Sequence, residues 1–153
     1  LVAVESALEM LNAVNDACVG ADMLIMAAAV ADFRVAEVAS KKIKKSTMGA
    51  ALELRLVPNP DIVASVDQPG LLKIGFAAES DDLLDNAAGK LASKGLAMIV
   101  ANSVDTIGSP TSEATLLFAD GTSIPLPRMS KEDLAANIVE AIARLANALN
   151  QIQ

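Results

Sequence analysis

The sequence predicts an α/β fold in which helices cover both faces of a largely parallel sheet, a three-layer, Rossmann-like architecture. Short apolar runs alternate along the chain with amphipathic helical patterns, as they do in strand-helix-strand units. Polar residues follow the apolar runs at their C-terminal ends, where sheets of this kind bind ligands. The chain has 153 residues, which suits one compact core. We expect residues 1–153 to form a single domain.

The chain begins with a predicted helix and a predicted buried strand. Ser6 and Glu9 form a capping box, which starts a helix over 6–19. Cys18 falls on the apolar stripe of this helix, which we expect to pack on the sheet. The apolar run that follows predicts a buried strand over 23–29.

The middle of the chain predicts an excursion from the main sheet. An irregular polar segment includes a predicted flap over 41–49. Residues 52–57 alternate apolar and charged, which is typical of a strand in a separate, small antiparallel sheet. The leucines of this strand share one apolar face, which predicts a homodimer interface. Asn59 is then expected to cap a helix that begins at Pro60.

The second half predicts two more buried strands, a hairpin and two helices. Asp120-Gly121 is a strong signal for a two-residue hairpin turn. We expect a strand over 73–76, followed by a helix that Ser80 caps and Gly95 ends, with Leu84 and Ala87 on its apolar stripe. A second strand is expected over 97–101, and the two strands of the hairpin over 115–119 and 122–126. The chain then ends with a helix that Ser130 caps.

Composition and charge exclude several classes of function. The chain has no histidine, which removes the Ser-His-Asp triad and the usual zinc ligand sets. A formal net charge of -7 argues against a nucleic-acid partner, which favours a broad basic face. No apolar run approaches the roughly 20 residues of a membrane span, and the first residues do not resemble a secretory signal. The single cysteine, Cys18, fits buried packing and a cytoplasmic location.

The stretch AAAVADFRVAEVASKKIKK over 27–45 indicates an anion site. Four of the twelve positive charges of the chain lie within residues 41–45. The small residues before them allow a ligand to approach the backbone. The alternative is a solvated basic loop, since charge runs are usually solvated.

The motifs of this stretch and of the chain after it resemble those of phosphopantothenate-cysteine ligase (phosphopantothenoylcysteine synthetase), in its C-terminal portion. The most specific part is AAVAD followed by KIKK, and the resemblance covers nearly the whole chain. The further matches, in order, are Asn59-Pro60-Asp61-Ile62, Gly75-Phe76-Ala77-Ala78-Glu79, Lys90 with Lys94, and Met98-Ile99-Val100-Ala101-Asn102. Ser103, Ala97 and Glu113 depart from the pattern of the family.

The resemblance implies an activity and its cofactors. Enzymes of this family join 4'-phosphopantothenate to cysteine in coenzyme A biosynthesis, through an acyl-nucleotide made from CTP in bacteria or ATP in eukaryotes, with Mg²⁺. They form dimers and are often fused to an upstream phosphopantothenoylcysteine decarboxylase. They also begin with a Gly-rich segment that this chain does not contain. We therefore expect a fragment of a longer ligase that is inactive alone.

The resemblance also implies roles for individual residues. Lys42 matches the catalytic lysine, whose ammonium would stabilise negative charge that moves between phosphates. No metal ligands are identified. The nucleotide-binding residues would be Ala27, Ala28, Asp32, Lys42, Asn59, Pro60, Asp61, Ile62, Phe76, Lys90 and Lys94.

Each of these residues has an ordinary structural alternative. Lys90 and Lys94 share one helix face and could simply pair with acidic residues there. Asp32 could be a turn former, and Phe76 could be core. The turn at 59–62 offers backbone N–H groups to an anion, but an ordinary helix start explains it equally well.

Two other functions remain as alternatives. An NAD-dependent oxidoreductase of Rossmann type is disfavoured, because no G-x-G-x-x-G follows a strand and the chain has no tyrosine. A nucleotide-binding or dimerising module without catalytic activity is the other.

Overall fold

The computed structural model describes residues 1–39, 41–43, 51–79, 82–106 and 108–150. A five-stranded sheet has the order β1-β4-β5-β6-β7, and a two-stranded sheet pairs β2 with β3. The strands are β1 (Met23–Met26), β2 (Phe33–Val35), β3 (Leu56–Pro58), β4 (Leu72–Glu79), β5 (Met98–Ser103), β6 (Thr111–Phe118) and β7 (Ser123–Ser130). The helices are α1 (Ala7–Cys18), α2 (Ile62–Ser65), α3 (Leu83–Ser93) and α4 (Lys131–Asn150), and a 3₁₀ turn spans Val104–Thr106.

The main sheet is largely parallel. β1 pairs in parallel with β4, and β4 with β5, whereas β6 is antiparallel to both of its neighbours. Four of the five strands therefore run in one direction, and only β6 is reversed. This confirms the expected Rossmann-like α/β class with a C-terminal hairpin.

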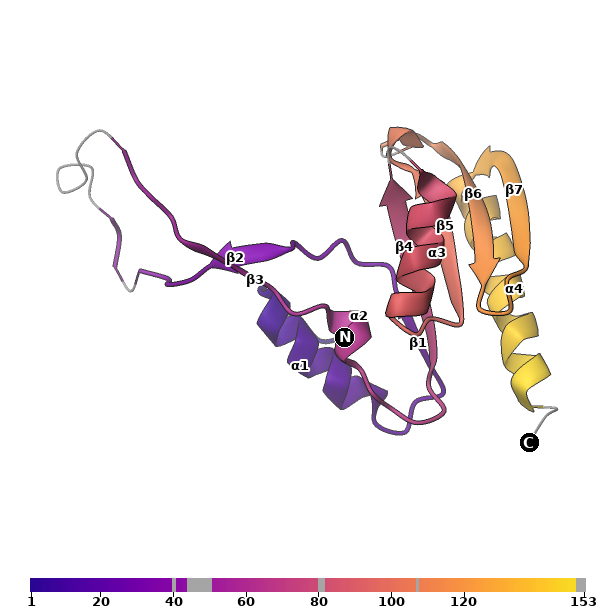
Figure 1. The fold of residues 1–153 in the computed structure, drawn as a ribbon, viewed down its shortest axis with the longest axis horizontal. Helices are drawn as coiled ribbons and strands as arrows, with labels where there is room; N and C mark the ends of the chain where they lie inside the picture. The colour runs from indigo at the N-terminus through magenta and orange to yellow at the C-terminus, as the bar shows by residue number, and fades with distance from the viewer. Residues whose placement is uncertain (40, 44–50, 80–81, 107, 151–153) are drawn as a thin grey trace.

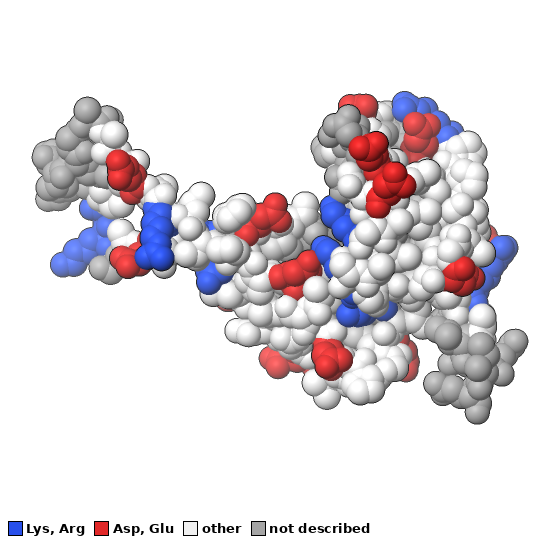
Figure 2. Space-filling view, in the orientation of Figure 1, with Lys and Arg blue, Asp and Glu red and all other residues white. Residues whose placement is uncertain are grey.

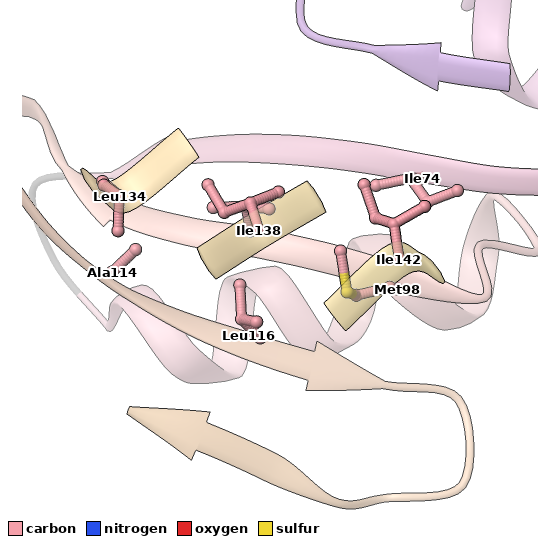
Figure 3. Close-up of a cluster of buried hydrophobic side chains, with 8 residues drawn as sticks. Ile74, Met98, Ala114, Leu116, Leu134, Ile138 and Ile142 are labelled. Atoms are coloured by element: carbon pink, nitrogen blue, oxygen red, sulfur yellow. The ribbon is translucent and has the colours of Figure 1, made fainter. Parts of the chain in front are cut away.

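Helices cover both faces of the sheet, so the domain has three layers (Figure 1). On one face, α4 packs its apolar stripe on β4, β5 and β6 (Figure 3). On the other face, α2 and α3 pack on β4 and β5 through residues that include Val63, Ala87 and Ile99. The buried members of the α4 cluster are Ile74, Met98, Val100, Ala114, Leu116, Leu134, Ile138 and Ile142.

Local capping signals are confirmed at two helices. The Ser6 hydroxyl accepts from the Glu9 N–H at 3.2 Å, and the Glu9 carboxylate accepts from the Ser6 N–H at 3.2 Å, which closes the capping box of α1. At α4, the Ser130 hydroxyl accepts from the Asp133 N–H at 3.0 Å. These bonds satisfy amides that would otherwise lack partners in the first turn.

A hairpin around Asp120-Gly121 is confirmed, but the predicted two-residue turn is wrong, because β6 ends at Phe118 and β7 begins only at Ser123. The Gly121 N–H donates to the Phe118 carbonyl at 3.0 Å, and Gly121 has a φ of +85°, which glycine adopts without strain. The two strands extend further than the sequence pattern predicted, since β6 begins at Thr111 and β7 ends at Ser130.

The predicted excursion forms an arm, defined here as the described residues 32–39, 41–43 and 51–58, which carries the two-stranded sheet away from the main body (Figure 1). The separate antiparallel sheet is confirmed, although its second strand covers only Leu56–Pro58. Leu52, Leu54 and Leu56 are all exposed, at 52, 58 and 54%. The predicted flap over 41–49 lies outside the described residues except at 41–43.

The prediction that the first helix packs on the sheet is wrong. The apolar stripe of α1 turns toward α2, and α1 lies apart from the main sheet (Figure 1). Cys18 is buried as expected, with 4% of its surface exposed. The pattern identified the correct face of the helix but not the element that this face contacts.

Two details of the other elements also need correction. β1 ends at Met26 and is not buried throughout, because Ile25 is 48% exposed on this edge strand. In α3, Ala87 faces the core as expected, but Leu84 is 49% exposed and Leu83 packs inward in its place. The N-cap of α3 is Asp82, with a φ of +46°, and Ser80 lies outside the described residues.

Candidate functional site

A cavity of about 180 Å³ lies where β1, β4, the start of α2 and the end of α3 meet. The segment after β1 contributes small side chains to its wall, among them Ala28 and Ala31. The turn before α2 forms a second wall, and Phe76 of β4 forms a third. The cavity lies just past the C-terminal end of β1 and beside the middle of β4; this class of fold binds ligands outside the C-terminal ends of its strands.

Nine of the eleven residues predicted from the sequence line this one cavity. They come from four segments that are far apart along the chain, and only the fold brings them together. The nine are Ala28, Asp32, Asn59, Pro60, Asp61, Ile62, Phe76, Lys90 and Lys94.

The other two predicted residues, Ala27 and Lys42, do not line the cavity. Ala27 is exposed directly after β1. Lys42 is exposed on the arm, between β2 and β3 along the chain. Lys44 and Lys45, the last two lysines of the basic cluster, lie outside the described residues.

Asn59 connects the two walls of the cavity. Its side-chain amide donates to the Ala31 carbonyl at 2.8 Å, and its backbone N–H donates to the Asp32 carbonyl at 2.7 Å. The Arg34 guanidinium donates to the Asn59 side-chain oxygen at 3.3 Å and also to the Pro58 carbonyl. These bonds fix the turn before α2 against the segment after β1.

The prediction that Asn59 caps the helix is therefore wrong. The N-cap of α2 is Asp61, whose carboxylate accepts from the Ala64 N–H at 3.1 Å. The side chain of Asn59 is already bonded to Ala31 and Arg34, so it is not the acceptor at the start of the helix.

Asp61 also pairs with Lys94, whose Nζ lies 2.9 Å from the carboxylate. This ion pair joins the start of α2 to the residue after α3. Partial burial acts to raise the pKa of Asp61, but the hydrogen bonds from Lys94 and the Ala64 N–H and the charges of Lys94 and Lys73 outweigh it. The pKa of Asp61 is consequently held below its ordinary value.

The lysines meet the prediction in part. Lys90 and Lys94 lie on one face of α3 and its last turn, and both contribute to the cavity. The ordinary alternative, a lysine paired with an acidic residue, also holds for Lys94. Figure 2 shows basic side chains gathered in the hollow between the main body and the part of the molecule beneath the arm.

Two phenylalanines of the motifs, Phe76 and Phe33, have different surroundings. Phe76 is 38% exposed, so it is a wall residue and not core. It also lines a second, more apolar cavity of about 450 Å³ between β4, β5 and α4, to which Ile25 and Asn102 contribute. Phe33 is 57% exposed on β2 and lines neither cavity.

Several residues of the site escaped the sequence analysis. Arg34 positions Asn59, and only its place within the AAVADFR motif could have indicated it. Gly75 lies in the cavity wall, where an added Cβ would come within 2.7 Å of Leu96 Cδ1. The match at GFAAE contained this glycine, although its role in keeping the wall open appears only in the structure.

The described residues show neither a metal-binding cluster nor a membrane-spanning helix. They contain no group of three or more His, Cys, Asp or Glu side chains placed to hold a metal ion. No helix in the described part of the chain is long and apolar enough to cross a membrane.

The chain is similar to proteins that are named for coenzyme A biosynthesis. The coenzyme A biosynthesis bifunctional protein CoaBC of Vibrio parahaemolyticus is 41% identical over 149 residues, which cover 93% of this chain and 37% of the relative. A crystal structure of the C-terminal domain of a CoaBC protein matches with a TM-score of 0.76 and 32% identity, covering 98% of this chain and 66% of that one.

A more distant structure has a similar fold. The Cab2 mutant H337A in complex with phosphopantothenate-cysteine matches with a TM-score of 0.60 and 21% identity, over 80% of this chain and 44% of that one. This likeness shows the fold alone.

The family assignment rests on a match along most of the chain. The model of the DNA/pantothenate metabolism flavoprotein C-terminal domain matches residues 1–145. The chain spans little more than a third of the length of the curated CoaBC relative from Vibrio parahaemolyticus. The chain belongs to the family of the DNA/pantothenate metabolism flavoprotein C-terminal domain.

Proposed function

We propose that the cavity binds the nucleoside triphosphate of a phosphopantothenate-cysteine ligase, and that the chain is the nucleotide side of that active site. The observation that carries this proposal is the convergence of nine motif residues on one cavity. The relatives named for coenzyme A biosynthesis support the same reaction.

The chemistry requires an activated carboxyl group. The carboxylate of 4'-phosphopantothenate attacks the α-phosphate of CTP or ATP, an acyl-nucleotide forms, and pyrophosphate leaves. The amine of cysteine then attacks the acyl carbon, and the nucleoside monophosphate leaves as the amide forms. Negative charge shifts between phosphates in the first step, so positioned cations accelerate it.

The cavity offers three kinds of group for this task. Lys90 and Lys94 supply positive charge for phosphates, and Phe76 supplies an apolar wall for a base or ribose. Small side chains at Ala28 and Ala31 let the ligand approach the backbone. Mg²⁺ would be held mainly by the phosphates with one or two carboxylates, and Asp32 supplies a carboxylate on the cavity wall.

We propose Lys42 as the catalytic lysine, supplied by the arm. Lys42 is exposed and outside the cavity wall, so the arm must change position before its ammonium reaches the reacting phosphates of the same chain.

The arm is also the proposed homodimer interface. Leu52, Leu54 and Leu56 together form an apolar surface, which water disfavours. We further propose fusion to an upstream decarboxylase, as in the bifunctional relatives, and a cytoplasmic location, which the single buried thiol of Cys18 fits.

Titration of the chain with CTP, ATP and NADH at equal Mg²⁺ tests the nucleotide site. Binding of CTP or ATP supports the proposal, and the triphosphate that binds more tightly is then identified as the co-substrate. Preference for NADH contradicts it and favours an oxidoreductase.

A second assay tests the reaction itself. Pyrophosphate release with 4'-phosphopantothenate is measured for the chain alone and within the longest protein that its gene encodes. Nucleotide binding without pyrophosphate release in either form would indicate a binding module in place of a ligase.

A further inference from the structure

The short helix α2 is held at both ends by lysine side chains from other elements. At its N-terminal end, Lys94 pairs with Asp61 at 2.9 Å. At its C-terminal end, the Lys73 ammonium of β4 donates to the Val63 carbonyl at 3.3 Å and to the Val66 carbonyl at 3.2 Å. Lys73 does not line the cavity and lies behind the helix that does.

A helix of this length needs such support. α2 has four residues, so it has few hydrogen bonds of its own, and the cost of forming a first helical turn is not recovered by later turns. Its last carbonyls have no partners within the helix. The Lys73 ammonium satisfies two carbonyls at this end and places a positive charge where the helix dipole is negative.

The position of α2 matters because the cavity wall continues directly into it. Residues 59–63 all line the cavity, and Ile62 and Val63 anchor the helix in the core with 3 and 7% of their surfaces exposed. The apolar anchors hold the helix against the sheet but do not fix its rotation or its position along its axis. The directional bonds at the two ends fix both the rotation of the helix and its position along the axis.

The Lys73 side chain also lies close to the turn after α3. A Cβ built on Gly95 would lie 3.7 Å from the Lys73 Nζ and 4.0 Å from its Cε. The ammonium therefore lies between the end of α2 and this glycine turn, within reach of both the helix carbonyls and the backbone of a neighbouring segment.

We propose that Lys73 is a positioning residue that fixes α2, and through it the wall formed by residues 59–63, without contacting the ligand. The inference rests on the proposed function of the cavity as a nucleotide site. It assigns to β4 a role in affinity, through two hydrogen bonds to α2 from a side chain that does not line the cavity.

The test compares Lys73→Met, which keeps the length of the side chain and removes the ammonium, with Lys73→Arg, which keeps a donor and a charge. Lys131→Met, at an exposed lysine of α4, is the control for loss of one positive charge. Two quantities are measured for each variant: the exchange rates of the Ala64 and Ser65 amide protons, and the dissociation constants of Mg²⁺ complexes of CTP and ATP.

We expect Lys73→Met to speed exchange at Ala64 and Ser65 and to weaken nucleotide binding roughly ten-fold, as the loss of two modest hydrogen bonds would. The exchange rates of the amide protons of β5 should stay unchanged. Lys73→Arg should recover most of both effects, and Lys131→Met should show neither. In a form that turns over, Lys73→Met should raise KM for the nucleotide while kcat stays within two-fold, roughly as for lost uniform binding.

Two results would overturn the inference. Unchanged exchange in Lys73→Met would show that the lysine does not hold α2, and faster exchange with unchanged nucleotide affinity would separate the helix from the site. If the parent chain binds neither nucleotide, the proposed function fails. The exchange rates, which need no ligand, then still decide whether Lys73 holds the helix.

Discussion

The side-chain amide of Asn59 donates a hydrogen bond to the Ala31 carbonyl, 2.8 Å away, across 28 positions of the sequence. This bond joins the two places where the arm leaves the main body and returns to it. The same turn carries Asp61, so the attachment of the arm and the wall of the cavity share one structural element.

Replacement of Asn59 by alanine should loosen both the arm and the cavity. Asn59→Ala removes the bond to Ala31 and the acceptor for Arg34, which should lower the free energy of unfolding by about 1–2 kcal/mol. Urea unfolding measures this change. Asn147→Ala, at an exposed position of α4, is the control, and an equal effect of both substitutions would contradict the role of Asn59.

The ion pair of Asp61 predicts a pH dependence of stability. The folded-state pKa of Asp61 lies below the ordinary value of 3.8, so the charged form stabilises the fold above that pH. The contribution is lost as the pH falls through the folded-state pKa. Asp61→Asn keeps an oxygen that can cap α2 and removes the charge, so it should be less stable than the parent near neutral pH.

Urea unfolding of both proteins across the acid range checks this prediction. The difference in stability should shrink below about pH 4 and vanish at lower pH. The effect should be modest, because the Asp61 side chain is 44% exposed. Asp67→Asn, at another exposed carboxylate, should show no such convergence, and a constant difference for Asp61→Asn would rule out the ion pair as its cause.

Two glycines should respond to alanine with opposite signs. Gly75→Ala places a methyl group 2.7 Å from Leu96 Cδ1, and because Leu96 is buried, with 4% of its surface exposed, we expect a destabilisation of about 1–3 kcal/mol. Gly89 of α3 has no atom within 4 Å of the added Cβ, so Gly89→Ala should stabilise by about 0.5–1 kcal/mol. Thermal unfolding of the two variants and the parent measures both changes. If Gly75→Ala is as stable as the parent, the Leu96 side chain can move aside.

The catalytic assignment of Lys42 predicts a loss of rate without a loss of fold. In a form of the protein that carries out ligation, Lys42→Gln should slow pyrophosphate release by about a hundred-fold or more, because one donor to the developing charge is removed. The melting temperature should not change, since Lys42 is exposed on the arm. Lys41→Gln is the matched control, and equal rates for the two variants would reject the assignment.

The proposed dimer predicts a change of mass in solution. Leu54 is 58% exposed, and Leu54→Glu places a charge in the centre of the proposed interface, where its burial is costly. Light scattering should then show a monomer. Leu8→Glu, at a leucine of α1 that is 43% exposed, should leave the dimer intact; a dimer that persists in Leu54→Glu would place the interface elsewhere.

Elements with local signals were predictable from the sequence, and contacts between distant segments were not. The capping box at Ser6, the turn at Gly121 and the start of α4 depend on residues within a few positions of one another. The partner of α1 and the bonds of Asn59 depend on segments that only the fold brings close. The pattern therefore assigned the cap of α2 to Asn59, although Asp61 forms it.

The candidate site was predictable only through its motifs. Spacing alone places Lys90 and Lys94 on one face, but it gives no reason for Asp32 and Phe76 to lie near them. Lys73 had no signal in the sequence, because a lysine in an apolar strand shows neither its direction nor the carbonyls that it contacts.

The small side chains at Ala28 and Ala31 limit how this wall of the cavity can change over evolution. An alanine side chain contributes no donor, acceptor or charge, so any selectivity at these two positions comes from the backbone and from the space left empty. Substitutions there can fill that space but cannot remove a side-chain interaction. The wall should therefore accept exchange among glycine, alanine and serine and exclude every larger residue, whatever its polarity.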